Sequence, residues 1–271
     1  MDRYAVVGNP VAHSRSPDIH HMFARQTGAA LSYERILTTT EQFDVCVTGF
    51  FASEGKGLNV TLPFKEQAWA LAENLDDAAR QAGAVNVLMP KAAGIWGGNS
   101  DGIGLVRDLM RNHAVALAGM RVLVLGAGGA ARGVVGALLE AAVSEIVIVN
   151  RTHARAQTLA EIWSDSRVGA ARMQQCRGTF GLVINATSAS LQGEVPEIDE
   201  RVLDATSLCY DLVYAPRDTA FVTWARTRGA RGVDGLGMLV EQAAESFFIW
   251  REVRPNTTPV VRALRQALSG G

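Results

Sequence analysis

The sequence predicts an α/β protein built from two lobes. Short apolar runs rich in β-branched residues alternate with helix-length segments rich in Ala and Leu along the 271 residues, which is typical of βαβ units. Around residues 94–104 the chain becomes rich in Gly, which indicates a crossing between lobes. A second series of strands and helices starts at Arg121, so we expect one sheet in each lobe.

In the first lobe, apolar spacing and Gly or Pro punctuation define the expected elements. Strands are expected near residues 4–8, 31–37, 57–59 and 84–88, and helices near 17–26, 41–52, 65–72 and 74–83.

In the second lobe, the run Arg121–Leu125 is continuously apolar after its first residue, which predicts a strand buried on both faces. Residues 238–254 have apolar residues at helical spacing and no Gly or Pro, so a long helix leaves this lobe. The remaining strands are expected near 146–149, 182–184 and 208–212, and the remaining helices near 129–142, 153–163, 219–227 and 259–268.

Composition narrows the classes of function. With 48% hydrophobic and 20% charged residues, the chain can bury a core, which excludes a disordered protein. Its 26 basic and 27 acidic residues nearly cancel, so we expect neither nucleic acid nor an anionic membrane as a partner. Any anionic ligand must be bound by local groups.

The cysteines, the histidines and the hydropathy exclude other classes. Cys46, Cys176 and Cys209 are far apart and form no C-x-x-C pair, which argues against a disulfide framework and a thiolate zinc site. The five His residues are not arranged with carboxylates as metal ligands, so no metal is expected. The first residues show no leader peptide, and the longest uncharged run, 178–193, is too short and too polar to span a bilayer. We therefore expect a cytoplasmic protein.

A glycine-rich turn follows the strand Arg121–Leu125 and opens the next helix. This is the G-x-G-x-x-A pattern in its strand–turn–helix context, where glycines let the backbone approach a pyrophosphate and the helix N-terminus supplies free N–H groups. The alternative is a turn that merely allows close packing. The pattern predicts a Rossmann domain whose dinucleotide contacts come from Gly126, Ala127, Gly128, Gly129 and Ala130.

The end of the second strand of this lobe indicates which dinucleotide is bound. An Asp or Glu there would bind a ribose 2′-hydroxyl, but this chain has Asn150, Arg151 and Thr152, with Arg155 one helical turn later. Guanidinium groups form paired, charge-assisted hydrogen bonds with a phosphate, which favours NADP over NAD. The alternative is an ordinary solvated helix start.

Lys65 is the candidate acid/base residue of the first lobe, and Asp101 is its candidate partner. The chain has only three lysines among its 26 basic residues, and the others are arginines. A lysine at this position is therefore unusual for this chain. An ammonium group can exchange a proton, whereas a guanidinium cannot at ordinary pH. The alternative is a solvated surface charge.

Together these blocks resemble the shikimate dehydrogenase family. They occur in family order and span the chain. The resembling blocks are Gly8-Asn9-Pro10, 13–17, 59–65, 82–86, 99–102, 126–131, 150–152, 185–188, Tyr210-Asp211 with Tyr214, and 234–240 with Gln242. The chain departs from the family pattern at Val87, Ser100 and Ala189-Ser190, beside the substrate and nicotinamide loops.

The resemblance implies an enzyme, an NADP-dependent oxidoreductase that reversibly reduces 3-dehydroshikimate to shikimate, in the pathway to chorismate and aromatic amino acids. It implies a substrate-binding and catalytic domain over residues 1–101, completed by helices over 238–271, and a Rossmann NADP-binding domain over 102–237. It also implies site residues. Lys65 and Asp101 would act at the reacting oxygen, and Ser14 and Ser16 would bind the substrate carboxylate. The other substrate-binding residues would be Asn59, Thr61, Asn86 and Gln242, which would bind ring hydroxyls, and Tyr214, which with Gly237 would face the cleft near the nicotinamide. Thr187, Leu212 and Gly235 would contact the cofactor.

Other functions stay open at this point. The nearest is a quinate/shikimate dehydrogenase that uses NAD, or a relative acting on another polyhydroxy acid. Others are an NADP-binding sensor without activity and a structural, partner-binding protein. The sequence is compatible with a monomer and with a homodimer.

Overall fold

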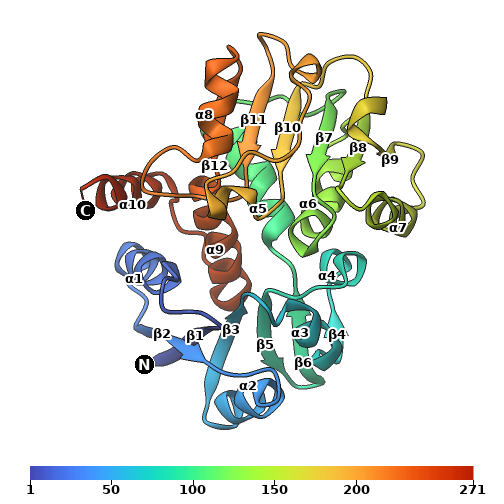
Figure 1. Ribbon diagram of the computed structural model, residues 1–271. Coiled ribbons are helices and arrows are strands. Elements are labelled where there is room, and N and C mark those ends of the chain that lie inside the picture. The colour runs from blue at the N-terminus through green and yellow to red at the C-terminus, as the bar shows by residue number, and fades with distance from the viewer. Residues whose placement is uncertain (271) are drawn as a thin grey trace. The chain divides into compact units, whose positions relative to one another are not determined.

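The computed structural model describes residues 1–270 and divides the chain into two compact units (Figure 1). The first unit comprises Met1–Gly104 and Val240–Val260, and the second comprises Leu105–Leu239 and the chain from Val261 onward. The expected α/β class with two lobes is confirmed. The boundaries differ from the expected 1–101 and 102–237, and the expected return of residues 238–271 to the first lobe holds only for 240–260.

The first unit contains a six-stranded mixed sheet in the order β2-β1-β3-β5-β6-β4. β1 is parallel to β2 and β3, β5 is antiparallel to β3 and β6, and β4 is parallel to β6. Its strands are β1 (Asp2–Gly8), β2 (Leu31–Leu37), β3 (Gly55–Val60), β4 (Asn74–Leu75), β5 (Val87–Lys91) and β6 (Gly94–Gly98). Its helices are α1 (Ser16–Thr27), α2 (Phe43–Ala52), α3 (Lys65–Leu71) and α4 (Asp77–Ala82).

Three helices run from one unit into the other. They are α5 (Asp101–Arg107), α9 (Leu236–Arg251) and α10 (Thr258–Ser269). A short π-helical turn, Asp108–Asn112, extends α5.

Each face of the first sheet has its own core, because successive side chains of a strand point to opposite faces. Val7 of β1 packs with Phe43 of α2 and Phe64, which precedes α3. On the opposite face of the sheet, the ring of His20 in α1 stacks on Tyr33 of β2 with 4.3 Å between ring centroids. The first of these cores includes Phe64, the residue directly before Lys65.

The second unit contains a six-stranded, fully parallel sheet in the order β12-β11-β10-β7-β8-β9. In chain order within the unit this is 6-5-4-1-2-3, which is the doubly wound Rossmann order. The strands are β7 (Arg121–Leu125), β8 (Glu145–Val149), β9 (Val168–Ala171), β10 (Leu182–Asn185), β11 (Leu208–Asp211) and β12 (Arg231–Asp234). The helices are α6 (Gly129–Glu140), α7 (His153–Trp163) and α8 (Ala220–Thr227).

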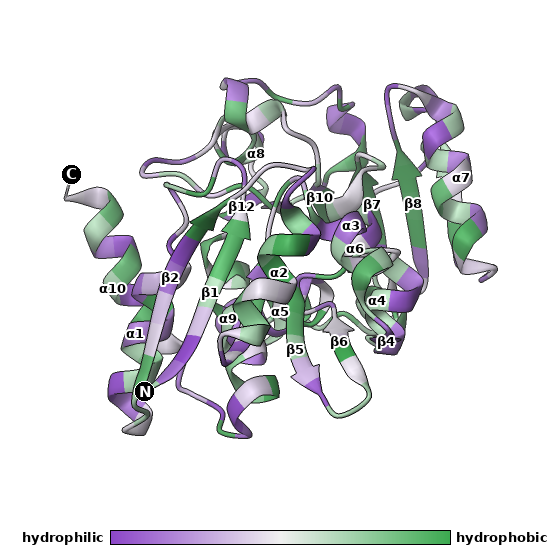
Figure 2. Ribbon diagram, turned by 90° about the horizontal axis from the view of Figure 1, so that it is seen from below, coloured by the Kyte–Doolittle hydropathy of each residue, from purple (hydrophilic) through white to green (hydrophobic). Residues whose placement is uncertain are grey.

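Burial on both faces explains why the central strands of this sheet are apolar throughout. Val124 of β7 belongs to a core with residues of α6 and α7, whereas Leu123 belongs to a second core with Phe221 of α8. Figure 2 shows β8 as largely hydrophobic, while α7 alternates polar and apolar residues, as expected for a helix with one solvent face. Among residues 1–270, no helix has the length and apolar character needed to cross a membrane.

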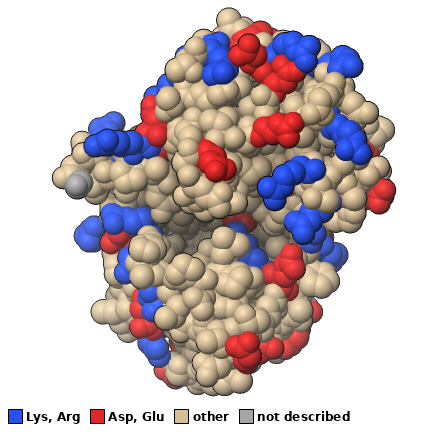
Figure 3. All heavy atoms as spheres, in the orientation of Figure 1, with Lys and Arg blue, Asp and Glu red and all other residues tan. Residues whose placement is uncertain are grey.

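The charged side chains of the surface are mixed in sign. On the face that Figure 3 shows, basic and acidic residues lie interspersed, with uncharged residues between them. This agrees with the net charge of -1 that the sequence carries.

Some elements differ from the expectation for identifiable reasons. β6 has the sequence GIWGG, and glycines are poor strand formers, yet a Cβ at Gly97 would lie only 2.8 Å from Ala72 Cβ. Close packing therefore selects glycine inside this strand. The expected helix over 74–83 begins instead with the two-residue strand β4, followed by α4, whose N-cap Asp76 accepts a hydrogen bond from Ala79 N. The short strands β9 and β12, which were not expected, lie at the two edges of the second sheet.

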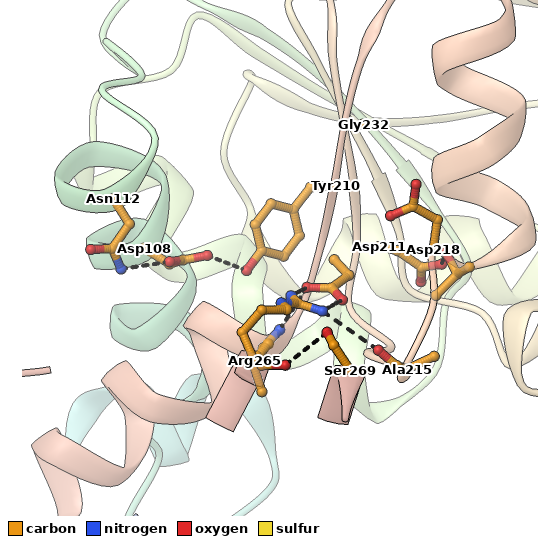
Figure 4. Close-up of polar contacts among 12 residues, drawn as sticks. Asp108, Asn112, Tyr210, Asp211, Ala215, Asp218, Gly232, Arg265 and Ser269 are labelled. Carbon is orange, nitrogen blue, oxygen red and sulfur yellow. Dashed lines mark hydrogen bonds and ion pairs between the residues drawn. The ribbon is translucent and has the colours of Figure 1, made fainter. Parts of the chain in front are cut away.

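Polar contacts join the segment Asp108–Asn112 and helix α10 to the sheet of the second unit (Figure 4). Tyr210 of β11 donates a hydrogen bond to Asp108 at 2.6 Å, and Asn112 donates to the same carboxylate at 2.7 Å. Arg265 of α10 forms an ion pair with Asp234, which is 8% exposed. The ion pair of Arg265 holds α10, near the end of the chain, on the second unit.

Candidate active site

The second unit has a cavity of about 720 Å³ at the carboxyl ends of its strands. It lies beside β7 and β10, which are adjacent although the chain places β8 and β9 between them. Ligands of open α/β sheets bind at such a reversal of strand order. The predicted cofactor residues that line it are Gly126, Ala127, Gly128, Asn150, Arg151, Thr152, Arg155 and Thr187.

Gly126 makes the tight turn that the sequence predicted. Its φ angle is +110°, and a Cβ added there would lie 2.9 Å from the carbonyl oxygen of Ala186. Its N–H donates to Val149 O at 2.7 Å. Both the backbone angle and the close approach of the β10 loop therefore require glycine at this position.

Gly128 has a different role, because a Cβ added there would meet no atom within 4 Å. It is the N-cap residue of the 12-residue helix α6, which has no side-chain cap. The space above its backbone and the uncapped N–H groups suit a pyrophosphate, which carries negative charge to the positive end of the helix dipole. Gly129 and Ala130, also expected at the cofactor, are the first residues of this helix and do not line the cavity.

Three arginines line the cavity near β8 and β9. The sequence predicted Arg151 and Arg155, which are exposed and form no ion pair or side-chain hydrogen bond with residues 1–270. Arg172 was not predicted. It follows β9, and the register of Val149 with Ala171 places it next to Asn150. Unpaired guanidinium groups in a cavity fit a dinucleotide with a 2′-phosphate.

The cavity also has a wall that sequence reasoning missed. Glu194 and Glu197 line it together with the three arginines, and Glu197 accepts a hydrogen bond from Gln174 at 3.1 Å. The lining residues without a sequence prediction include Leu125, Val149, Met173, Ala189, Gln192, Val195 and Pro196. Most follow strand β9 or β10 in loops or in the short 3-10 turns Met173–Gln175 and Ala189–Gln192, which are too short to show a periodic pattern in the sequence.

Leu212 and Gly235 lie together at the ends of β11 and β12, but they do not line this cavity. Leu212 N donates to Asn185 O at 3.0 Å, and a Cβ at Gly235 would lie 2.8 Å from the carbonyl carbon of Leu212. Both residues thus lie at the carboxyl ends of the strands, the edge of the sheet at which the cavity is found. Tyr214 lies in the loop between β11 and α8 and is half-buried. Gly237, in the first turn of α9, lies against the carboxylate of Asp108 and does not line the cavity either.

In the first unit, Lys65 and Asp101 form an ion pair. Lys65 Nζ lies 2.6 Å from Asp101 Oδ2, and the side chains are 24% and 6% exposed respectively. Lys65 is the first residue of α3, and Asp101 is the first residue of α5. The half-buried ammonium group therefore has a fixed carboxylate partner and still reaches solvent.

Amide side chains hold this carboxylate from the buried side. Asn86 Nδ2 donates to Asp101 Oδ1 at 2.8 Å and to Gln242 Oε1 at 3.1 Å. Asn86 Oδ1 accepts from Ser100 N at 2.8 Å, and Asn99 Oδ1 accepts from Asp101 N at 3.0 Å. Because the carboxylate and the amides around it have hydrogen-bond partners, the carboxylate is held in one orientation.

Asn59 extends the same network. Its Nδ2 atom donates to Asn86 O at 3.1 Å and to Ser246 Oγ at 2.8 Å, while its Oδ1 atom accepts from Tyr33 at 2.8 Å. Burial raises the pKa of Tyr33 well above its ordinary value, which keeps its hydroxyl a donor. The structure thus brings Asn59, Asn86, Gln242, Asp101 and Lys65 into one hydrogen-bonded chain.

Ser14 and Ser16 form a separate pair in the loop that leads into α1. Ser14 Oγ donates to Ser16 Oγ at 3.1 Å, and Arg35 of β2 donates two hydrogen bonds to Ser14 O at 2.9 and 2.7 Å. Thr61 follows β3, and its N–H donates to Val7 O at 3.0 Å. Sequence reasoning missed Arg35 and Tyr33, which position predicted residues from the neighbouring strand. Nothing in the sequence indicates such contacts across strands.

Family models match three segments of the chain. A model described as "Shikimate dehydrogenase substrate binding domain" matches residues 6–88, and one described as "Shikimate / quinate 5-dehydrogenase" matches residues 108–218. A third, "Shikimate 5'-dehydrogenase C-terminal domain", matches residues 235–265.

Individual proteins match along nearly their whole length. Shikimate dehydrogenase (NADP(+)) from Alkalilimnicola ehrlichii is 56% identical over 266 residues, which cover 97% of this chain and 98% of that protein. The crystal structure of an Ael1 enzyme from Pseudomonas putida has a TM-score of 0.93 and 43% identity, with 97% and 98% of the two chains covered. That of shikimate 5-dehydrogenase from Thermus thermophilus, in complex with NADP(H) and shikimate, has a TM-score of 0.89 and 34% identity, with 98% and 100% covered.

These matches agree with the parallel Rossmann sheet of the second unit and with its glycine turn. The chain therefore belongs to the shikimate dehydrogenase family of NADP-dependent oxidoreductases.

Proposed function

We propose that the chain catalyses the reversible reduction of 3-dehydroshikimate to shikimate with NADPH. The observation that carries this proposal is the Lys65–Asp101 ion pair, held by Asn86 within a network of amide and hydroxyl groups. Such a network suits a small polyhydroxy acid, because amides both donate to and accept from hydroxyl groups.

The ion pair has the chemistry that carbonyl reduction requires. When bound, NADPH supplies the hydride that the carbonyl carbon receives. Negative charge then develops on the carbonyl oxygen, and the ammonium group of Lys65 stabilises it or donates the proton. Asp101 keeps the ammonium group in place. In the oxidative direction, if Lys65 is the proton donor, its neutral amine accepts the hydroxyl proton and becomes the ammonium group again.

The remaining residues of the first unit would bind the rest of the substrate. Ser14 and Ser16 offer two hydroxyl groups for the carboxylate, and Thr61, Asn59, Asn86 and Gln242 would bind the ring hydroxyls. This assigns substrate binding to the first unit and cofactor binding to the second. Arg35 donates two hydrogen bonds to the carbonyl oxygen of Ser14, which holds the serine loop in place and supports the first assignment.

Arg151 and Arg155 support NADP as the cofactor, because their guanidinium groups line the cavity without an ion-pair partner among residues 1–270. A negatively charged side chain in their place would favour NAD. The runner-up, a quinate/shikimate dehydrogenase that uses NAD, would need a cavity that accepts a free ribose hydroxyl next to two arginines.

The test is turnover of the purified protein with shikimate or quinate, each paired with NADP or NAD, followed by the absorbance of the reduced nicotinamide. We expect rapid reduction of NADP with shikimate and slow or no reaction in the other three mixtures. Turnover mainly with quinate and NAD would support the runner-up. A folded protein that binds NADP but turns over neither acid would contradict the assignment of substrate.

A further inference from the structure

We propose that Asp211 is a positioning residue for the cofactor cavity: its carboxylate sets the orientation of the Asn185 amide, which in turn fixes the Thr187 loop. The inference rests on the proposed function in that the ligand of the cavity is taken to be NADP. Asp211 is the last residue of β11, is 0% exposed and does not line the cavity.

The carboxylate of Asp211 is surrounded by donors alone. Oδ1 accepts from Asn185 Nδ2 and from Val213 N, both at 3.1 Å. Oδ2 accepts from Ser190 Oγ at 2.5 Å and from Thr219 Oγ1 at 2.6 Å. Burial still raises the pKa of this carboxyl above its ordinary value, which means that burying the ionised group costs free energy of folding. An apolar side chain at this position would avoid that cost. We therefore infer that Asp211 has a role other than stabilising the fold.

An ionised carboxylate only accepts hydrogen bonds, and this decides which way the Asn185 amide faces. The Nδ2 atom must face Asp211, so the Oδ1 atom faces the loop after β10. There it accepts from Thr187 N at 3.0 Å and from Thr187 Oγ1 at 2.7 Å. A flipped amide would place NH₂ against these two groups and lose both bonds.

The same carboxylate holds the other end of this loop. Ser190 Oγ donates to Asp211 Oδ2 and accepts from Asn185 Nδ2 at 3.2 Å. Between these two anchors, Thr187 Oγ1 accepts from Ala189 N at 3.3 Å. Thr187, Ser188 and Ala189 all line the cavity. One buried group therefore defines the shape of a cavity wall that it does not touch.

The test substitutes Asp211→Asn, which keeps the shape but leaves one acceptor oxygen for the four donors that two carboxylate oxygens bind. We expect the affinity for NADP, measured by calorimetry without substrate, to fall about tenfold. The KM for shikimate should change less than about twofold, because the substrate network lies in the first unit. Hydrogen exchange at Thr187 N should become faster.

Two further variants separate positioning from stability. Thr219→Val removes one hydrogen bond to Asp211 and the cap of α8, but leaves Asn185 in place. It should lower the melting temperature while the affinity for NADP stays within about twofold. The exchanged pair Asn185→Asp with Asp211→Asn restores an acceptor toward Thr187 and should recover much of the affinity. Equal losses of NADP affinity in Asp211→Asn and Thr219→Val, or no recovery in the exchanged pair, would overturn the inference.

A measurement on the parent protein covers the case in which Asp211→Asn does not fold. Without ligand, Thr187 N should exchange as slowly as the amides of β10, because its acceptor is fixed. Exchange at the rate of an exposed loop would overturn the inference. A parent that does not bind NADP would overturn the proposed function as well, whereas a parent that binds and an Asp211→Asn variant with unchanged affinity would overturn this inference alone.

Discussion

Lys65 Nζ and Asn86 Nδ2 donate to different oxygens of Asp101, at 2.6 and 2.8 Å. The carboxylate is therefore bound on both sides, and it is the ammonium group of Lys65 that reaches the surface. A group that is held this way loses little conformational freedom when a substrate binds. In the proposed reaction, Asp101 fixes the position of the charge and Lys65 stabilises the developing negative charge or exchanges the proton.

Substitutions of Lys65 distinguish its two possible roles. Lys65→Ala should lower kcat by about 10²–10⁴-fold, because it removes both the charge and the exchangeable proton. Lys65→Arg keeps the charge but cannot release a proton at neutral pH, so activity close to the parent's would assign Lys65 an electrostatic role. The readout is initial rate with shikimate and NADP. Lys56→Ala, at an exposed position of β3, is the matched control and should retain full activity.

Arg151 should determine the preference for the phosphorylated cofactor. In Arg151→Ala, we expect the KM for NADP to rise about 10–100-fold and the KM for NAD to change little, because only the 2′-phosphate loses a partner. Arg155→Ala should act in the same direction. Arg201→Ala, which removes an exposed arginine paired with Asp199, is the control. Equal effects on both cofactors would argue against a phosphate contact.

Two glycines of the same turn should respond differently to Ala. Gly126→Ala should lower the free energy of unfolding by about 1–3 kcal/mol, because of its φ of +110° and its contact with Ala186 O. Gly128→Ala should leave the melting temperature unchanged, since the added methyl group meets no protein atom within 4 Å. It should still weaken NADP binding, because the methyl group would occupy the space above the turn. Thermal unfolding and calorimetry on both variants test this contrast, and a Gly128→Ala variant with parental affinity would contradict it.

His20 should make the stability of the protein depend on pH. Burial lowers the pKa of His20 from 6.5 to about 3, so between these values the unfolded chain binds a proton that the folded chain excludes. The free energy of unfolding should therefore decrease as the pH falls through this window, by about 1.4 kcal/mol per pH unit from this residue. His20→Phe, which keeps a ring against Tyr33, should reduce the slope by that amount. Denaturant unfolding between about pH 6.5 and pH 4.5 measures it, and parallel slopes would contradict the assignment.

Local patterns in the sequence were sufficient to predict an element when the residues that determine it are adjacent in the chain. The run Arg121–Leu125 and the following glycines predicted β7, the turn and α6 because burial on both faces and glycine geometry are properties of adjacent residues. β6 and β12 contain glycines that only their tertiary contacts explain, as Gly232 lies under Val222 O with 2.8 Å to an added Cβ. Their strand character therefore could not be predicted locally.

The same distinction applies to the candidate site. Lys65, Asp101 and the motif amides were found in the sequence because each lies in a recognisable block. Arg172 reaches the cavity only because β9 pairs with β8 in a particular register, and Asp211 acts through Asn185, 26 positions away in the chain. Such relationships depend on strand pairing, which single-sequence patterns do not specify. The roles of the motif residues in catalysis and substrate binding stay predictions.

The cavity of the second unit is lined entirely by residues 125–197, which form one continuous stretch of the chain. Lys65 and Asp101 lie outside that stretch, in the other unit. A graft of residues 125–197 between related enzymes would therefore exchange the whole lining of this cavity and leave Lys65 and Asp101 unchanged. The buried contacts of Asp211, at the end of β11, are the junction that such a graft would have to match.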